Sequence, residues 1–338
     1  MLCILRRMKS MNKFTYYGPF KTMIQDFISL KQSIGYKYLT EAEHLKRFDT
    51  FTLQNYASAT LLTKTIVMHW CIKKSYEKQA NLCSRASMIR QLAMYMSDFQ
   101  KNTYIIPKNY FKSGEKYIPY IYTNKELKRF FMETDKCHYC SECPYRHLIM
   151  PILFRMLYSC GLRVSEARLL KVKDVDLNRG ILTINHSKKD NSRLVPMTEQ
   201  LTKRCQDFSK KVHQNPNIEA YYFPIRDNTP MRNCNVYNNF RRFLLRAGIS
   251  HGGRGFGPRV HDFRHTFSVN CLKKWSLEGK DLMTYLPILR IYLGHDSFEE
   301  TAYYLRLTAD VFPQITLKLE STYPELIPVI GGDNHETN

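Results

Sequence analysis

Apolar residues recur every three or four positions through the first third of the chain, and this spacing predicts amphipathic helices. In the first such segment, Phe20, Ile24 and Phe27 fall on one helical face. Thr40 and Thr63 open two later segments, where a side-chain oxygen can cap the start of a helix. The pattern therefore predicts helices at Pro19–Ser33, Thr40–Leu53, Thr63–Tyr76 and Ser84–Thr103.

The periodicity stops at Pro107 and returns near Thr123. Residues 108–121 are rich in Lys, Tyr and Pro, a composition typical of a basic linker. Beyond the linker, Thr123 and Glu126 form a capping-box pattern at the start of a helix. Further helices are expected at Arg146–Cys160, Thr198–Val212, Asn233–Ala247, His261–Trp275, Leu286–Leu293 and Glu300–Leu307.

Two short apolar segments interrupt this helical pattern and predict strands. Ile181–Asn185 and Arg193–Met197 flank a polar stretch that ends in Asp190-Asn191-Ser192, a composition typical of a turn. The two strands would pair as a hairpin in a small antiparallel sheet. The chain is therefore expected to be mainly α with a small antiparallel β-sheet, an α+β fold.

Basic residues strongly outnumber acidic ones. The 338 residues include 51 Lys and Arg but 30 Asp and Glu, which gives a net charge of +21. Such an excess favours a polyanionic partner, and nucleic acid is the first candidate. A membrane surface is the alternative. It is less favoured because the sequence has no strongly amphipathic basic helix and no run of about 18 apolar residues.

The N-terminus and the ten cysteines bear on the compartment and on metal binding. The segment Met1–Lys13 places its apolar residues before its basic ones, unlike a secretory signal, so we expect a cytoplasmic protein with reduced thiols. Small core residues are predicted at Cys71, Cys160, Cys205 and Cys271.

A separate group of zinc-ligand residue types is formed by Cys137, Cys140, Cys143 and His147. Its spacing fits no common zinc site, and no second Cys pair follows. We interpret the group as an insertion with solvent-facing thiols, with zinc binding as the alternative. No metal and no cofactor is therefore expected.

Four local segments carry residue types that can act on a phosphate. A glycine-led turn places Arg163 at a helix start with Glu166 one turn later. His261 and Arg264 share one helical face. Each of these pairs, taken alone, is more simply explained as part of a solvated helix surface.

The other two segments are a polar turn and a tyrosine pair. Lys188 and Lys189 lie in the turn of the predicted hairpin, and His295 precedes Tyr303 and Tyr304 on a late helix. Lysines at a hairpin tip are usually just solvated, and an aromatic pair usually packs in a core.

Taken in order, the four segments resemble the boxes of the tyrosine recombinases, the phage-integrase family. The chain reads GLRVSEARLLKVKDVD, then ILTINHSKKDNSRLVPM, then HDFRHTF, then LGHDSFEETAYYLRLT. These are similar to the family's first-arginine box, lysine-bearing β-hairpin, His-x-x-Arg box and terminal box. Four ordered boxes are specific, and the resemblance covers most of the chain.

The resemblance implies catalytic residues at Arg163, Lys188, His261, Arg264, His295 and Tyr304. Tyr304 is the implied nucleophile because the family's tyrosine stands nine residues after its last histidine, as Tyr304 does after His295. Tyr303 would lie about 100° away around the helix. Lys189 stays open as an alternative to Lys188, since a one-residue slip in a turn costs little.

The resemblance also implies an architecture. The expected two-domain clamp on double-stranded DNA comprises an N-terminal extension (1–13), a helical core-binding domain (14–107), a basic linker (108–121), a catalytic domain (122–322) and a C-terminal tail (323–338). A homotetramer on two recombination sites, with accessory DNA-bending or directionality proteins, is the implied assembly.

The implied activity is site-specific recombination that integrates or excises a mobile element. Duplex DNA would be cut and rejoined through a 3′-phosphotyrosyl intermediate, without a metal. The alternatives are a catalytically silent DNA-binding regulator on the same fold and DNA relaxation of the type IB topoisomerase kind.

Overall fold

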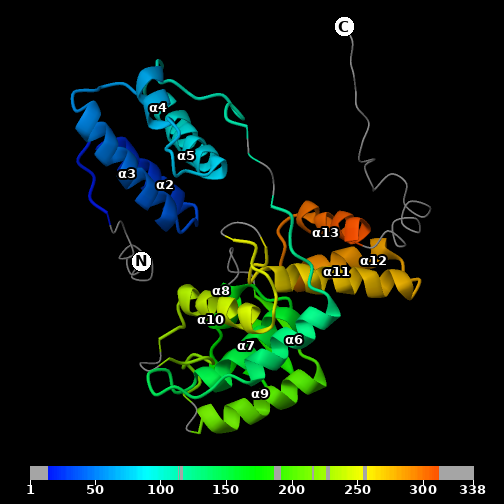
Figure 1. Ribbon diagram of the computed structural model, residues 1–338. Coiled ribbons are helices and arrows are strands. Elements are labelled where there is room, and N and C mark those ends of the chain that lie inside the picture. The colour runs from blue at the N-terminus through cyan, green and yellow to red at the C-terminus, as the bar shows by residue number, and fades with distance from the viewer. Residues whose placement is uncertain are drawn as a thin grey trace. The chain divides into compact units, whose positions relative to one another are not determined.

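The computed structural model describes residues 14–112, 114, 117–185, 192–214, 217–225, 229–253 and 257–311. The chain forms two compact units, Met1–Tyr117 (unit 1) and Ile118–Asn338 (unit 2), which are described separately below (Figure 1). The boundary between the units lies inside the predicted linker, 108–121. The extension 1–13, the hairpin tip 186–191 and the C-terminal residues 312–338 lie outside the described residues.

Unit 1 is helical throughout its described elements. It contains α2 (Lys21–Ser33), α3 (Leu39–Asn55), α4 (Lys64–Trp70) and α5 (Gln79–Ser97). Aromatic rings meet within its largely aliphatic core, where Phe48 stacks on Phe20 and contacts Trp70 edge to face. Each helix predicted from the apolar spacing is present, although the bounds differ.

Two of these differences have a tertiary cause. Thr63 caps α4 as expected, but Thr40 lies inside α3 and caps nothing. The helix starts after Tyr38, which adopts a left-handed conformation (φ 47°) while its ring packs edge-on against Phe27. The helix α4 ends at Trp70, before the predicted Tyr76. The Arg85 guanidinium bonds Trp70 O at the end of the helix and Ile72 O just beyond it.

Unit 2 is mainly helical with one small sheet, as the sequence predicts. Its helices are α6 (Asn124–Asp135), α7 (Arg146–Ser159), α8 (Val164–Arg168), α9 (Glu199–Val212), α10 (Asn233–Arg246), α11 (Asp262–Leu277), α12 (Leu282–Leu293) and α13 (Phe298–Val311). The predicted capping box of Thr123 and Glu126 is present at the start of α6. Helix α12 starts at Leu282 rather than Leu286, because Asp281 caps it by accepting hydrogen bonds from the N–H groups of Met283 and Thr284.

The sheet is antiparallel with the order β1-β2-β3. The predicted hairpin is formed by β2 (Ile181–Ile184) and β3 (Arg193–Pro196), which pair from Ile181 opposite Pro196 to Ile184 opposite Arg193. The short strand β1 (Val175–Asp176) was not predicted, because two residues are too few to show a period-two pattern. Arg193 therefore stands at the first paired position after the hairpin tip.

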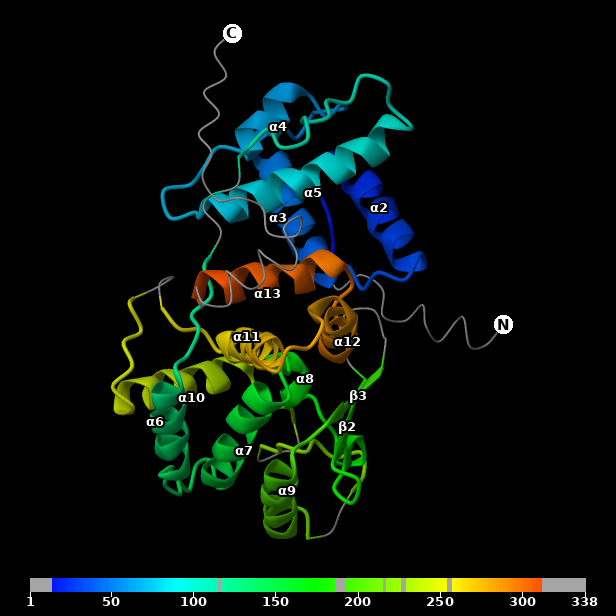
Figure 2. The same ribbon diagram turned by 90° about the vertical axis from the view of Figure 1, so that its right-hand side faces the viewer.

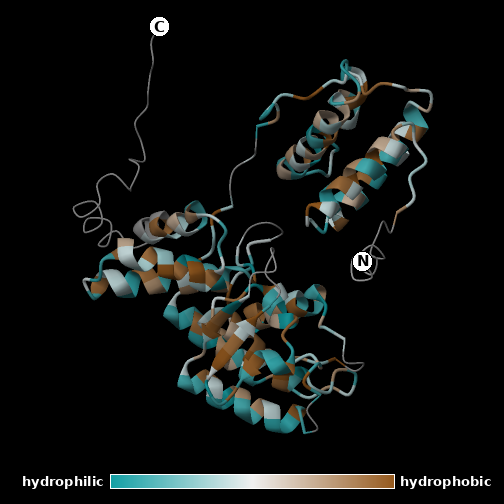
Figure 3. Ribbon diagram, turned by 180° about the vertical axis from the view of Figure 1, so that it is seen from behind, coloured by the Kyte–Doolittle hydropathy of each residue, from teal (hydrophilic) through white to brown (hydrophobic). Residues whose placement is uncertain are grey.

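Two apolar clusters organise unit 2. The larger surrounds α7, where Phe130, Phe154 and Phe263 contact one another in the interior. Because Phe263 belongs to α11, this packing fixes the start of that helix. The smaller cluster joins α11, α12 and α13, which lie side by side in Figure 2, and it includes Tyr304. The helices of both units carry apolar stripes beside hydrophilic ones (Figure 3).

Three of the four predicted core cysteines, Cys71, Cys160 and Cys205, are buried, whereas Cys271 is only partly buried. Within the described ranges, no helix is long and apolar enough to cross a membrane.

Candidate active site

The end of helix α12 brings three arginines together. The consecutive carbonyls of Tyr292, Leu293 and Gly294 each accept a hydrogen bond from a different guanidinium. Arg193 Nε bonds Tyr292 O at 2.8 Å, Arg264 Nη2 bonds Leu293 O at 2.7 Å, and Arg163 Nη2 bonds Gly294 O at 3.1 Å. The last carbonyls of a helix have no partner within it and form the negative end of its dipole. They therefore suit this cluster of cations.

Gly294 ends α12 in a left-handed conformation, with φ of 64°. This turn places His295 directly beside the three carbonyls. A Cβ added to Gly294 would lie 3.0 Å from Arg193 Nη1, so the arginine packs directly on the glycine backbone. Glycine is required here by its backbone conformation and by this close approach.

Arg163 stands at the N-cap of α8, as the glycine-led turn predicts. Its Nη1 bonds Glu166 Oε1 at 3.0 Å, and its backbone N–H bonds Glu166 Oε2 at 2.9 Å. Glu166 is buried. Burial by itself would raise the pKa of this carboxyl, but the hydrogen bonds and charge of Arg193 and the Arg163 N–H bring it below its ordinary value. Glu166 therefore remains an anion among cations.

Arg264 is 1% exposed, the most deeply buried cation of the site. Besides Leu293 O, it bonds Gly161 O through Nη1 at 2.8 Å. Burial, followed by repulsion from Arg163, lowers the pKa of Arg264 to about 10. The guanidinium therefore stays charged at neutral pH, and two carbonyls fix its plane.

The rings of His295 and Tyr304 lie next to each other in the site. Their rings stack with centroids 5.8 Å apart and an interplanar angle of 15°. His295 Nδ1 lies 2.8 Å from Thr301 Oγ1. Burial and the charges of Arg264 and Arg163 lower the pKa of His295 to about 3, so the imidazole is neutral at physiological pH.

Tyr304 is 3% exposed, whereas Tyr303 is 38% exposed. Burial raises the pKa of the Tyr304 phenol, while the charge of Arg264 and hydrogen bonds with Ser268 and Arg264 act in the opposite direction. The hydroxyl is thus buried, but its polar neighbours include the Arg264 guanidinium. It is Tyr304 rather than Tyr303 whose ring stacks on His295.

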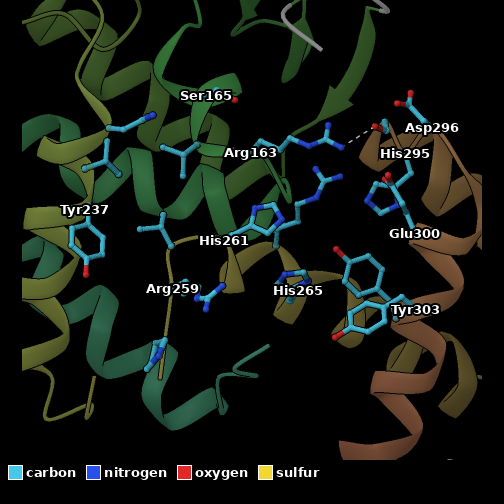
Figure 4. Close-up of a pocket in the computed structure, with 18 of the residues that line it drawn as sticks. Arg163, Ser165, Tyr237, Arg259, His261, His265, His295, Asp296, Glu300 and Tyr303 are labelled. Carbon is cyan, nitrogen blue, oxygen red and sulfur yellow. Dashed lines mark hydrogen bonds between the residues drawn. The ribbon is translucent and has the colours of Figure 1, made fainter. Parts of the chain in front are cut away.

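A single cavity of about 1140 Å³ collects these groups. Figure 4 shows Arg163, His261 and His295 directed into one space. Of the six residues expected from the sequence, Arg163, His261, Arg264, His295 and Tyr304 line this cavity. Lys188 lies outside the described residues, as does its alternative Lys189. The base of their hairpin, at Ser192 and Arg193, does line the cavity.

His265 is a cavity residue that the sequence reasoning passed over. Its ring centroid lies 4.8 Å from that of His261 and 5.5 Å from that of Tyr304. Burial, followed by repulsion from His261 and Arg264, lowers its pKa to about 3. Its buried Nδ1 has no hydrogen-bond partner. The sequence does contain a signal for His265. It follows His261 by four positions, and residues four apart share one helical face.

The possible zinc ligands do not form a site. Within the ranges that the structure describes, no three His, Cys, Asp or Glu side chains are placed to hold a metal ion together. Cys137, Cys140, Cys143 and His147 all fall within those ranges.

Comparison with known proteins identifies the family. The model of the phage integrase family matches residues 121–310, which is more than half of the chain. The chain belongs to the phage integrase family. This is the family of the tyrosine recombinases, which are site-specific DNA recombinases. The match starts one residue before the catalytic domain expected from the sequence and ends twelve residues before its expected end at 322.

Curated relatives match this chain over different lengths. The proposed integrase/recombinase y4rB of Sinorhizobium fredii is 27% identical over 314 residues, covering 91% of this chain and 99% of that protein. Tyrosine recombinase XerC of Chlamydia caviae is 28% identical over 159 residues, covering 46% of each chain.

Solved structures show the same fold. The XerH site-specific recombinase, bound to its palindromic difH substrate, superposes with a TM-score of 0.61 at 17% identity, covering 95% of this chain and 93% of that one. The Tn1549 transposon integrase in complex with circular intermediate DNA gives 0.61 at 16%, covering 83% and 94%. The mainly helical, two-domain α+β fold is thus that of tyrosine recombinases.

Proposed function

We propose that this integrase cuts and rejoins double-stranded DNA at specific sites through a covalent 3′-phosphotyrosyl intermediate formed on Tyr304. One observation carries the proposal. The tyrosine of the terminal box shares a cavity with Arg163, Arg264 and His295, although these residues come from three separate parts of the chain.

In the proposed reaction, the Tyr304 oxygen attacks a backbone phosphorus and forms a P–O bond. The P–O bond to the 5′-oxygen of the next nucleotide breaks, and that oxygen takes up a proton. The 3′-phosphotyrosine keeps the energy of the broken bond. A 5′-hydroxyl from a partner strand then attacks the same phosphorus and releases Tyr304, so the exchange needs no ATP.

The arginines would stabilise the transition state. Charge builds up on the non-bridging oxygens of the five-coordinate phosphorus, and fixed guanidinium donors favour that state over the ground state. Arg163 and Arg264 are held by carbonyls and by Glu166 before DNA arrives, which avoids reorganisation during the reaction. His295, with Nδ1 engaged by Thr301, would donate a further hydrogen bond from Nε2.

The remaining residues would transfer protons. The raised pKa of the Tyr304 phenol means that it carries its proton until a base accepts it. His261 is the proposed base, and the scissile phosphate would displace the phenol from its bond with Arg264. Lys188 on the hairpin would protonate the leaving 5′-oxygen. These cations and donors would replace the metal ions that many nucleases use.

The proposed substrate is duplex DNA, and the net charge of +21 supports a polyanionic partner. We further propose that a homotetramer joins two sites in the cytoplasm, with accessory DNA-bending or directionality proteins. Integration or excision of a mobile element is the proposed role. It is supported by the likeness to y4rB and by the fold shared with the Tn1549 transposon integrase.

The test is a covalent trap. The full chain is incubated with a library of nicked duplexes of randomised sequence, so that cleavage releases a short strand and leaves the protein attached. The wild type should give a denaturant-resistant adduct, and the attached DNA is sequenced to find the site. Tyr304→Phe should abolish the adduct with little change in DNA affinity, whereas the matched variant Tyr303→Phe should keep it.

Two outcomes would contradict the proposal. Sequence-specific binding without any adduct would favour the silent DNA-binding regulator. Relaxation of supercoiled DNA without joining of two sites would favour the activity of the topoisomerase type.

A further inference from the structure

Arg193 occupies a central position among the charged groups of the site. Its side chain, 8% exposed, enters from strand β3 at the base of the hairpin. Nη1 bonds Glu166 Oε1 at 3.0 Å and Nη2 bonds Glu166 Oε2 at 2.8 Å, a two-pronged pair, while Nε bonds Tyr292 O. One side chain thus connects three separate segments of unit 2.

The Glu166 carboxylate accepts hydrogen bonds from two arginines. Each of its carboxylate oxygens accepts one bond from Arg163 and one from Arg193. Oε1 receives the two Nη1 donors, and Oε2 receives the Arg163 backbone N–H and Arg193 Nη2. Because Arg193 supplies a full fork, Glu166 engages the Arg163 guanidinium through only one nitrogen. The other Arg163 nitrogens remain for Gly294 O and for the cavity.

We propose that Arg193 is a positioning residue for strand cleavage, which holds Arg163 toward the cavity by occupying and neutralising Glu166. This inference rests on the cleavage reaction proposed above. Without Arg193, the buried Glu166 carboxylate would keep Arg163 as the guanidinium to which it is hydrogen-bonded. The strongest arrangement left to that pair is two-pronged, and it would draw Arg163 away from a bound phosphate.

Charge adds to this geometric effect. Arg163, Arg193 and Arg264 surround the single carboxylate of Glu166, so the cluster carries a net charge of about +2. Removal of Arg193 halves that charge where the scissile phosphate would bind. Lysine at this position would restore the charge but not the fork, and glutamine would restore neither.

The experiment compares Arg193→Lys and Arg193→Gln with the wild type in single-turnover cleavage of the trapped duplex at saturating protein. Arg155 offers a matched control in the same unit. It forms a two-pronged pair with Asp135, at 2.8 and 2.7 Å, and does not line the cavity. We expect Arg193→Gln to slow cleavage by about 10²-fold, with DNA affinity within about threefold. Arg193→Lys should recover part of the rate, and Arg155→Gln should cleave like the wild type.

A double-mutant cycle separates positioning from general support of the fold. If Arg193 acts through Glu166, the variant that combines Arg193→Gln with Glu166→Gln should cleave no more slowly than the slower single variant. Multiplied effects in the double variant, or a wild-type rate in Arg193→Gln, would overturn the proposal.

A second readout does not depend on cleavage. In protein labelled with ¹⁵N-arginine, the side-chain signal of Arg163, assigned with Arg163→Lys, reports its hydrogen bonds. That signal should shift in Arg193→Gln and stay unchanged in Arg155→Gln. Absence of a wild-type adduct would refute the proposed function alone, while an unmoved Arg163 signal would refute the positioning role.

Discussion

Replacing His265 with glutamine is expected to make unit 2 less sensitive to acid. In the folded protein the pKa of His265 is lowered to about 3, first by burial and then by the charges of His261 and Arg264. In an unfolded chain a histidine titrates near about 6.5. Between these values only the unfolded state takes up the proton, so acid favours unfolding.

The size of the effect follows from the two pKa values. The neutral His265 contributes fully to the free energy of unfolding above about pH 6.5. This contribution is lost progressively as the pH falls toward 3. At pH 5, the uptake of a proton by the unfolded chain costs about 2 kcal/mol of stability relative to pH 8. The His265 side chain is only 15% exposed, so solvent screening removes little of this. Glutamine does not titrate, and this part of the pH dependence should vanish.

Urea unfolding measures the effect in unit 2 alone. The chain has two tryptophans, and Trp275 lies on α11, the helix that carries His265. In a Trp70→Phe background, the fluorescence of Trp275 therefore reports the unfolding of unit 2. The free energy of unfolding is measured at pH 8 and pH 5, with and without His265→Gln. His138→Gln, on an exposed loop, is the matched control.

The stability lost between pH 8 and pH 5 should be smaller by about 2 kcal/mol in His265→Gln than in its parent and in the control. Equal losses in all three proteins would refute the assignment of His265 as a neutral imidazole buried beside Tyr304.

Four further results are expected. Gly294→Ala should destabilise unit 2 by about 1–2 kcal/mol in urea unfolding, because its φ of 64° is left-handed and its Cβ would crowd Arg193; unchanged stability would contradict the packing described here. Arg163→Ala should lower the single-turnover rate of adduct formation by about 10²–10³-fold, and a mild loss would show that the boxes do not converge on phosphate. DNA affinity in filter binding should fall by about 10³-fold or more between 50 and 200 mM salt, whereas EDTA should leave the cleavage rate unchanged.

The sequence predicts those parts of the molecule that depend on local chemistry. The capping box of Thr123 and Glu126 lies within one helical turn, and the pairing of β2 with β3 follows from two apolar segments around a polar turn. The presence of Arg264 and Tyr304 in one cavity could be expected only from the resemblance, because the spacing of single residues does not fix tertiary contacts.

The contacts that organise the site could not be predicted, because they join residues far apart in the chain. Arg163 reaches Gly294 across 131 positions, and Arg193 reaches Tyr292 across 99. In the sequence Arg193 is one more basic residue at the start of a strand. Its two hydrogen bonds to Glu166 become evident only in the folded structure. The left-handed start of α3 at Tyr38 has the same explanation, since packing against Phe27 accompanies it.

The most direct test of the account is to find which atom of the protein joins the DNA. The trapped adduct is digested with protease and nuclease, and the modified peptide is sequenced by mass spectrometry. The account predicts a nucleotide linked through its 3′-phosphate to the Tyr304 oxygen. A nucleotide on Tyr303, or a linkage through a 5′-phosphate, would contradict it.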